Sequence, residues 1–389
     1  MSLIGSVEET YRSLFRIPPG WHYLNCAYMA PLARPVEAAG IAALRRQRIP
    51  WQIGPESFFQ PAEQVRERFA RLIGLANPDR VAVLPSVSYG MAILTRNVPL
   101  GRGQEIILPA EDFPSSVYPW ARLAQEQGGL LRMIPPPTEG RDRGRRWNER
   151  LLEAISTRTA VVLVPPVHWT DGTRFDLEAI GRRAREVGAC FVVDGTQAIG
   201  ALPWSIEAVR PDALLCAGYK WLLGPYGVTV GYFGPRFEGA VPLEESWLNR
   251  QGSEDFARLV EYPQSYRPGA RRFDVGQRSP VLLSMLAEAL SLLLRWGPEA
   301  ISRHARRLAE PFWEAVSELG YEVNAEPYRT PHLFGLRGID AQRLRALGNA
   351  LRRRRICVSI PGTVLRISLH LYNQAEDTEA LLEVLRRLR

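Results

Sequence analysis

The chain has 389 residues, which is enough for a large core, and its length alone predicts two or three domains. Its hydrophobic content of 46% and charged content of 23% are typical of an ordinary globular protein. The sequence contains no run of about 18 uncharged apolar residues, so we predict no membrane span. The net charge of +8 would permit nucleic-acid binding. The arginines are spread along helical segments or gathered in short runs, without a helix-turn-helix, zinc-finger or RNP-like pattern, so we expect no nucleic-acid partner.

The first twenty residues indicate the cell compartment, and the spacing of the cysteines indicates whether a metal site is expected. Residues 1–20 contain acidic and basic side chains and no apolar segment of the kind found in a secretory signal, so we predict a cytoplasmic protein. The four cysteines form no CxxC pair and no metal-ligand spacing, so we expect no metal site. Cys190 and Cys216 stand in apolar runs and are interpreted as small buried residues.

Short apolar runs alternate with helical stretches from about residue 60 to 235. Their valine and leucine content, without polar alternation, is typical of strands buried on both faces of a sheet, and strand–helix alternation predicts a mainly parallel α/β domain. The stretch 135–146 contains three prolines and is expected to be a surface loop. In chain order the predicted helices and strands are helix 64–75, strands 81–84 and 105–109, helix 116–127, strand 160–165, helix 177–187, and strands 190–194 and 213–216.

The chain from about 236 to 275 is rich in proline, glycine and aromatic residues, and we expect loops there. The remainder predicts a smaller α+β domain. Its expected elements are helices 281–296 and 298–320, strands 321–325 and 333–335, helix 341–353, strands 356–360 and 364–371, and a final helix. We therefore expect an N-terminal arm over 1–22 that joins the small domain, a large domain over 23–280, and a linking helix with the small domain over 281–389.

Lys220 is the single lysine of the chain, among 49 basic residues. A desolvated ammonium can lose its proton and attack a carbonyl carbon, whereas a guanidinium, with a pKa above ~12, cannot. A chain that uses arginine everywhere else and keeps one lysine therefore predicts that this amine is a nucleophile.

Polar residues follow several of the predicted strands. Asp194 ends the strand 190–194 and begins the sequence DGTQ, and Lys220 follows the strand 213–216 in GYKWLLGPYG. The segment PSVSYG, residues 85–90, places hydroxyl groups at the start of a helix, where free N–H groups and the helix dipole can hold a phosphate. EDFPS, residues 111–115, can place an aromatic ring over a flat ligand. Together these features supply what pyridoxal phosphate needs: a lysine for a Schiff base, an acid for the ring nitrogen, a phosphate site and a stacking ring.

The DGTQ block and the lysine 26 positions after its Asp194 resemble the class V branch of fold-type I pyridoxal-phosphate enzymes, which includes cysteine desulfurases, kynureninase, isopenicillin epimerase-like proteins and several aminotransferases. The resemblance extends from YLNCA, residues 23–27, to LRIS, residues 365–368. It implies the fold of the fold-type I transferases. In that fold a large domain contains a mainly parallel, seven-stranded sheet covered by helices, and a smaller α+β domain follows at the C-terminus. It also implies pyridoxal 5′-phosphate as the cofactor, an amino acid as the substrate, and a homodimer with the active site at the subunit interface.

The resemblance also implies roles for individual residues. Lys220 forms the Schiff base and moves protons, Asp194 pairs with the ring nitrogen, and Gln197 bonds the phenolic oxygen of the ring. The other cofactor contacts that it implies are the stacking ring of Phe113 and, around the phosphate, Val87, Ser88, Tyr219 and Ser279, the last reaching it from the partner subunit. Arg366 is expected to bind the substrate α-carboxylate, and the N-terminal segment to contact the substrate through Asn25 and Tyr28.

The reaction itself is less constrained. Cysteine desulfurases carry a nucleophilic cysteine on a loop shortly before the carboxylate-binding arginine, but Cys357 lies inside a predicted strand and the segment that follows it is short. We therefore interpret Cys357 as structural and predict no persulfide-forming desulfurase. His168, after the strand 160–165, is a candidate for acid–base catalysis or a structural histidine. The leading hypothesis is an aminotransferase. The alternatives are a C–S lyase or kynureninase-like hydrolase on the same scaffold, and a non-catalytic binding protein that kept the fold.

Overall fold

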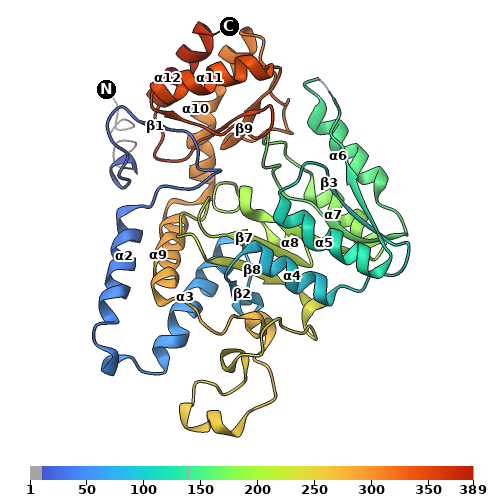
Figure 1. The fold of residues 1–389 in the computed structure, drawn as a ribbon, viewed down its shortest axis with the longest axis vertical. Coiled ribbons are helices and arrows are strands. Elements are labelled where there is room, and N and C mark those ends of the chain that lie inside the picture. The colour runs from blue at the N-terminus through green and yellow to red at the C-terminus, as the bar shows by residue number, and fades with distance from the viewer. Residues whose placement is uncertain (1–10, 139, 389) are drawn as a thin grey trace.

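A computed structural model describes residues 11–138 and 140–388 (Figure 1). A large α/β layer occupies the middle of the molecule, and a smaller domain built mainly from residues 298–388 lies above it in this view (Figure 1). Residues 1–10 of the predicted N-terminal arm lie outside the described residues. Within the rest of the arm, Arg12 donates hydrogen bonds to the backbone oxygen of Tyr372 and to Asp377. This contact ties the N-terminal segment to the small domain.

The large domain is organised around a seven-stranded sheet with the order β2-β8-β7-β6-β5-β3-β4. All neighbouring pairs are parallel except those that involve β8, which runs antiparallel to both β2 and β7. The expectation of a mainly parallel sheet is therefore confirmed. The strands are β2 (Val81–Leu84), β3 (Glu105–Pro109), β4 (Leu130–Ile134), β5 (Thr159–Leu163), β6 (Cys190–Asp194), β7 (Ala213–Ala217) and β8 (Thr229–Phe233).

Successive residues of a central strand enter different cores because side chains alternate across a sheet. In β5, Val161 and Leu163 belong to one buried cluster and Val162 to another. One cluster is completed by α4 (Val87–Asn97) and α5 (Pro114–Gln127), and the other by helices on the opposite face. Those helices are α2 (Arg34–Arg46), α3 (Glu56–Leu72), α6 (Arg143–Ala154), α7 (Leu177–Glu186) and α9 (Pro280–Trp296), and the short α8 (Ile206–Val209) joins them. Burial on both faces explains why these strands read as uninterrupted apolar runs.

The small domain has its own hydrophobic core. Its helices α10 (Pro298–Glu318), α11 (Ala341–Arg353) and α12 (Ala375–Arg387) pack on the antiparallel pair β9 (Leu333–Leu336) and β11 (Leu365–Ser368). The two-residue strands β1 (His22–Tyr23) and β10 (Ile356–Cys357) pair in parallel beside it, and Leu24 enters the same core. The helix α9 lies against α2 and α3, so its buried side belongs with the large sheet. The proposed boundary at residue 281 stays a prediction.

Several predicted elements differ from the structure. Strands β4 and β8 were not expected: β4 is a half-exposed edge strand followed by three prolines, and Gly231 weakens the strand signal of β8. The predicted loop 135–146 ends earlier, because α6 begins at Arg143. The strand expected over 321–325 does not form. Only Glu322 pairs there, in an isolated bridge with Arg337, while the backbone N–H of Ala325 and the side chain of Asn324 bond to Arg141 and Thr173 of the large domain.

Within the described residues, no single helix is long and apolar enough to cross a membrane, and α9 with α10 meets that criterion only as a pair bent by 72°.

Candidate active site

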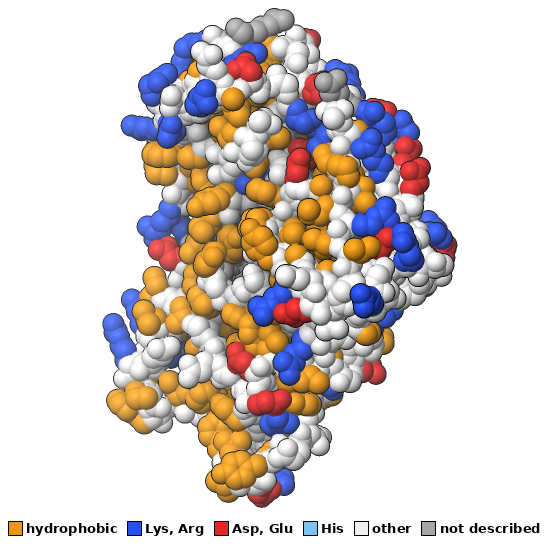
Figure 2. Space-filling model, turned by 45° about the vertical axis from the view of Figure 1, so that its right-hand side comes forward, with side chains coloured by type: hydrophobic (Ala, Val, Ile, Leu, Met, Phe, Trp, Pro, Cys, Tyr) orange, Lys and Arg blue, Asp and Glu red, His pale blue; other side chains and the backbone are white. Residues whose placement is uncertain are grey.

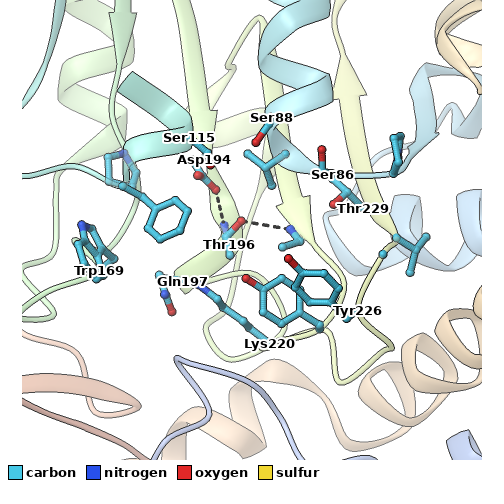
Figure 3. Close-up of a pocket in the computed structure, with 18 of the residues that line it drawn as sticks. Ser86, Ser88, Ser115, Trp169, Asp194, Thr196, Gln197, Lys220, Tyr226 and Thr229 are labelled. Atoms are coloured by element: carbon cyan, nitrogen blue, oxygen red, sulfur yellow. Dashed lines mark hydrogen bonds between the residues drawn. The ribbon is translucent and has the colours of Figure 1, made fainter. Parts of the chain in front are cut away.

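A pocket opens where β6 and β7 end and α4 begins, which is the edge at which parallel α/β sheets place ligand sites (Figure 3). Ser86, Ser88, Thr229 and Tyr226 lie at one end, Trp169 lies at the other, and Asp194 and Lys220 lie between them. The lining residues are Pro85, Ser86, Val87, Ser88, Asp112, Phe113, Ser115, Pro165, Val167, Trp169, Asp194, Thr196, Gln197, Ala217, Tyr219, Lys220, Tyr226, Gly227, Val228 and Thr229.

Lys220 is buried, with 7% of its surface exposed, and its amine points into this pocket. Its Nζ lies 5.3 Å from the ring centre of Phe113 and 5.5 Å from that of Tyr219. Burial, followed by the positive charge of Arg366, lowers the pKa of Lys220 to about 8, against the opposing effect of Asp194. The neutral, nucleophilic form of this amine is therefore far more populated near neutral pH than that of an exposed lysine.

Asp194 is held at the end of β6 by two hydrogen bonds to its carboxylate. The backbone N–H of Thr196 donates to Oδ1 at 3.0 Å, and the hydroxyl of Ser116 donates to Oδ2 at 3.0 Å. Both oxygens of this buried carboxyl group therefore have hydrogen-bond donors. A buried carboxylate without a cationic side chain bonded to it suits a protonated ring nitrogen as its partner.

The end of the pocket at α4 is suited to a phosphate. Ser86 caps this helix by accepting a hydrogen bond from the N–H of Tyr89, a cap that contributes about 1 kcal/mol. The cap leaves the first-turn N–H groups of Val87 and Ser88 directed at the pocket, together with the Ser88 hydroxyl and the positive end of the helix dipole. Tyr219 also lines this region, and burial raises the pKa of its phenol, so it is a neutral hydrogen-bond donor.

Two aromatic side chains form the opposite wall. Phe113 and Trp169 meet edge to face, with ring centres 5.5 Å apart and planes at 86°. The indole N–H of Trp169 donates to the backbone oxygen of Glu111 at 2.7 Å, which fixes the turn that carries Phe113. The predicted stacking residue therefore lies in the pocket wall beside Lys220.

Gln197 joins the floor of the pocket to the rest of the site. Its amide nitrogen donates to the backbone oxygen of Ala27 at 3.2 Å, and its amide oxygen accepts from the indole of Trp221 at 2.8 Å. One amide hydrogen remains for a ligand. This is the donor that the predicted contact with a phenolic oxygen requires.

Arg366 lies behind the aromatic wall, on β11 of the small domain. It is 4% exposed, and burial lowers the pKa of its guanidinium to about 10. It donates to the backbone oxygen of Trp169 at 2.8 Å and to the hydroxyl of Ser359 at 3.1 Å, while its Nε has no partner among the described residues. No carboxylate of the described chain forms an ion pair with it. A buried guanidinium without an acidic partner is a binding site for an anionic group of a ligand.

Besides Arg366, four predicted site residues do not line this pocket: Asn25, Tyr28, Ser279 and His168. Asn25 is connected to Arg366 only through Ser359, whose hydroxyl donates to Asn25 Oδ1 at 2.5 Å. Tyr28 is 62% exposed and lines a neighbouring groove. Ser279 caps α9, so a contact with a phosphate requires the partner subunit and remains a prediction.

For His168 the sequence left two interpretations open, and it does not line the pocket. Its ring is fully buried between Trp147 and Phe175, and its Nδ1 lies 2.8 Å from the hydroxyl of Thr170. Burial lowers its pKa to about 4, so the ring is neutral. The neighbouring Trp169 points into the pocket in its place. The geometry thus favours a structural histidine over an acid–base catalyst.

Sequence reasoning missed two residues of the pocket lining, Asp112 and Thr196, and Ser116, which supports Asp194 from outside the lining. Ser116 stands three positions after Phe113, one helical turn away, so its position at a helix start was a usable signal. Thr196 uses its hydroxyl to accept from the N–H of Ala217, which joins the ends of β6 and β7. No local pattern distinguishes such a threonine from an ordinary turn residue.

The residues present fit pyridoxal phosphate. The pocket combines a buried amine and a carboxylate that accepts two hydrogen bonds. The same cavity contains a helix start with free N–H groups and an aromatic ring. Each of these groups matches one part of the cofactor: the aldehyde, the ring nitrogen, the phosphate and the ring face.

Comparison with known proteins agrees with this geometry. Residues 55–381 match the family described as Aminotransferase class-V. An uncharacterized aminotransferase, YcbU of Bacillus subtilis (strain 168), is 26% identical over 375 residues and covers 95% of both chains. A probable cysteine desulfurase of Methanothermobacter thermautotrophicus is 25% identical over 393 residues, with 94% of both chains covered. Among solved structures, a C-DES mutant with glycine covalently linked to its PLP cofactor superposes with a TM-score of 0.83 at 20% identity, covering 96% of this chain and 98% of that one.

Proposed function

Because this chain belongs to the class-V aminotransferase family, we propose that it is a pyridoxal-phosphate enzyme that acts on an α-amino acid, and that its reaction is transamination. When bound, pyridoxal phosphate supplies an electron sink for the bond at the substrate Cα that breaks. The residues of the chain supply the attachment point, the ring partner, the phosphate site and the carboxylate site.

The observation that carries the proposal is that Lys220 shares the pocket with Asp194 and is close enough to Arg366 for the charges of both to act on its amine. The pKa of Lys220, about 8, allows its Nζ both to accept a proton from the substrate Cα and to return one. Arg366, on the far side of the aromatic wall, orients the substrate through its carboxylate.

The content of the pocket supports transamination. Among its described lining residues there is no histidine and no cysteine, and the titratable groups are Asp112, Asp194, Tyr219, Lys220 and Tyr226. Transamination needs one group that takes a proton from one carbon and delivers it to another on the same face. Lys220 Nζ can perform both transfers, so this pocket contains all the acid–base groups that the reaction requires.

The experiment follows the visible absorption of the cofactor-loaded protein with a panel of amino acids, first without and then with a keto acid. An aminotransferase loses the visible band with its donor amino acid and recovers it when a keto acid is added. If the band persists while pyruvate, alanine, sulfide or ammonia accumulates, the reaction is an elimination or a hydrolysis and transamination is ruled out.

Replacing Arg366 is expected to weaken substrate binding. In Arg366→Lys a single ammonium replaces the bidentate fork, and we expect kcat/KM for an amino acid to fall about 10²-fold or more, mainly through KM. The control is the matching amine without its carboxylate, whose kcat/KM should change little between the two proteins. Equal losses for the acid and the amine would contradict the carboxylate assignment.

A C–S lyase is the second candidate. One solved structure with the same fold, at a TM-score of 0.81 and 21% identity, is the cystine C–S lyase C-DES in complex with cysteine persulfide, covering 94% of this chain and 97% of that one. Elimination of a thiolate also uses a single basic group at Cα, so the residues of the pocket support this reaction as well. Released keto acid and sulfur product, in the same assay, would identify it.

From the sequence we predicted that the chain is not a persulfide-forming cysteine desulfurase. The comparisons do not support that prediction, because probable cysteine desulfurases are among the relatives, so this activity remains an alternative. The position of Cys357 argues against it: the residue lies in β10, paired with Tyr23 of β1, and lines the neighbouring groove, not the pocket of Lys220. Residues 359 and 366 bond across a tight turn that leaves no long loop between them.

The variant Cys357→Ser is therefore expected to keep at least half of the wild-type turnover of the identified substrate. The measurement is a steady-state assay, with Cys190→Ser, at the start of β6 and outside the pocket lining, as a control for the loss of a thiol elsewhere. A loss of activity confined to Cys357→Ser, together with sulfide release from cysteine by the wild type, would establish desulfurase chemistry.

The remaining parts of the proposal are the homodimer and the cytoplasmic location. Figure 2 shows hydrophobic side chains gathered down one face of the molecule, and Tyr226 of the pocket rim is 69% exposed. A partner subunit that covers this rim would shield it from water.

A monomer in sedimentation experiments would contradict the dimer. A protein that stays colourless with pyridoxal phosphate would instead support the non-catalytic alternative.

A further inference from the structure

A second carboxyl group lies in the pocket beside Asp194. Asp112 lines the same cavity and is 8% exposed. Its Oδ1 accepts a hydrogen bond from the N–H of Phe113 at 2.7 Å, while its Oδ2 is buried without a partner among the described residues. A buried, unpartnered carboxylate oxygen would be strongly destabilising if ionised. The site therefore calls for a proton on this oxygen.

The backbone forces Asp112 inward. Glu111, the residue before it, has a φ of 60°, a left-handed conformation that costs on the order of 1 kcal/mol or more for a residue with a side chain. The indole of Trp169 holds this turn by donating to the Glu111 oxygen, and Phe113 packs on the same indole. The strained turn thus presents Asp112 to the cavity in a fixed position.

The environments of the two carboxyl groups differ in a direction that separates their roles. Asp194 receives hydrogen bonds on both oxygens, from Thr196 and Ser116, and is suited to carry the charge. Asp112 receives one, and burial followed by the negative charge of Asp194 raises its pKa to about 8. Neighbouring carboxyl groups with opposed environments divide into one acid and one carboxylate.

The other titratable groups around Asp112 do not provide a counter-charge. Lys220 and Tyr219, after β7, share the cavity with it, and Glu111 of its own turn is an additional acid. His168, packed behind the same turn, is neutral because its pKa is lowered to about 4. Arg366 of β11 lies beyond the rings of Phe113 and Trp169. Within the described part of the chain, no cation forms an ion pair with Asp112.

We propose that Asp112 is a positioning residue for the cofactor: a neutral carboxylic acid whose proton points into the pocket, and which keeps the charge of the acid pair on Asp194, opposite the ring nitrogen. This inference rests on the proposed function for the identity of the cofactor, but the proton on Asp112 belongs to the protein alone. Above about pH 8 the pair gains a second negative charge, which stabilises protonated groups in the pocket.

The test compares Asp112→Asn, which keeps the shape and a polar hydrogen but cannot ionise, with Glu111→Gln, which removes the adjacent acid outside the pocket lining. In the protein without cofactor, infrared difference spectra should show a protonated carboxyl band below pH 8 that is lost above it in the wild type and in Glu111→Gln. The band should be absent throughout in Asp112→Asn. A wild type without this band would overturn the proposal, whatever reaction the enzyme performs.

A second measurement uses stability. An acid whose pKa is raised on folding contributes stability that is lost as pH rises through its folded value of about 8, because the unfolded acid is already ionised there. The Tm of Asp112→Asn relative to the wild type should therefore rise by about 2 °C or more between mildly acidic and alkaline pH. Glu111→Gln should show no such trend, and a pH-independent difference for Asp112→Asn would count against the proposal.

The third measurement uses the loaded protein. The pH midpoint of the visible-band titration should fall by about one unit in Asp112→Asn, since the variant lacks the charge that appears at alkaline pH, and should be unchanged in Glu111→Gln. An unchanged midpoint in Asp112→Asn would reject the influence on the cofactor, even if the infrared band is present. If no variant binds pyridoxal phosphate, the proposed function fails while the first two measurements still test Asp112.

Discussion

Replacing Lys220 with alanine is expected to lower turnover by about 10⁴-fold or more and to abolish covalent attachment of the cofactor, while the fold is retained. The reason is that the attachment and the proton transfers at Cα both require the same Nζ, and no other amine lies in the pocket. The measurements are steady-state kinetics and the mass of the protein after borohydride reduction with pyridoxal phosphate. A reduced adduct of unchanged stoichiometry in Lys220→Ala would show that attachment occurs elsewhere.

The matched control is Lys220→Arg, which keeps a cation in the pocket but has no nucleophilic amine. It should be as inactive as Lys220→Ala. A further expectation concerns the wild type: the rate of cofactor attachment should rise with pH and level off above about pH 8, because the pKa of Lys220 is lowered to about 8. Continued acceleration up to pH 10 would contradict a desolvated amine.

Replacing Asp194 with asparagine is expected to lower kcat on the order of 10³-fold, with a smaller loss of cofactor affinity. Asparagine can still accept from the N–H of Thr196 and can bond the hydroxyl of Ser116, so the turn after β6 should persist. In the proposed reaction it removes the negative charge that would keep a bound ring nitrogen protonated. The measurements are kcat for the identified substrate and circular dichroism of the fold.

The control for Asp194 is Asp212→Asn. Asp212 stands directly before β7, at the end of the strands opposite to the pocket, and its carboxylate accepts a hydrogen bond from the N–H of Phe191. It should leave kcat within about twofold of the wild type, since it does not line the pocket. Equal losses in both variants would indicate a general effect on the sheet and would contradict a specific role for Asp194.

The central strands and the chemistry at their ends could be predicted from the sequence because both depend on local patterns. The range of β3 agrees with the prediction at both ends, as does that of β6, since a strand buried on both faces is an apolar run with a clear start and end. Lys220 and Asp194 were identifiable because one is unique in composition and the other ends such a strand. The roles assigned to these residues stay predictions until the variants are measured.

The rest depended on contacts between segments that are distant in the chain. The antiparallel insertion of β8 between β2 and β7 is set by pairing, which no local pattern encodes. Trp169 and His168 are adjacent in sequence, and only the packing of His168 against Trp147 decides which of the two faces the pocket. The proposed role of Asp112 could not be predicted from the sequence for the same reason, because that role depends on the nearby Asp194, which stands 82 positions later in the chain.

The burial of Lys220 has a practical consequence for the outer surface. All other basic residues are arginines, so the folded exterior bears no lysine side chain. Aldehydes, including excess free cofactor, attach readily to surface amines in most proteins, and here the backbone amino terminus is the single other primary amine. The bound chromophore per chain therefore counts functional sites directly. For the same reason, crosslinkers that join lysines would miss the proposed dimer, so a test of it by crosslinking needs guanidinium- or carboxyl-directed reagents.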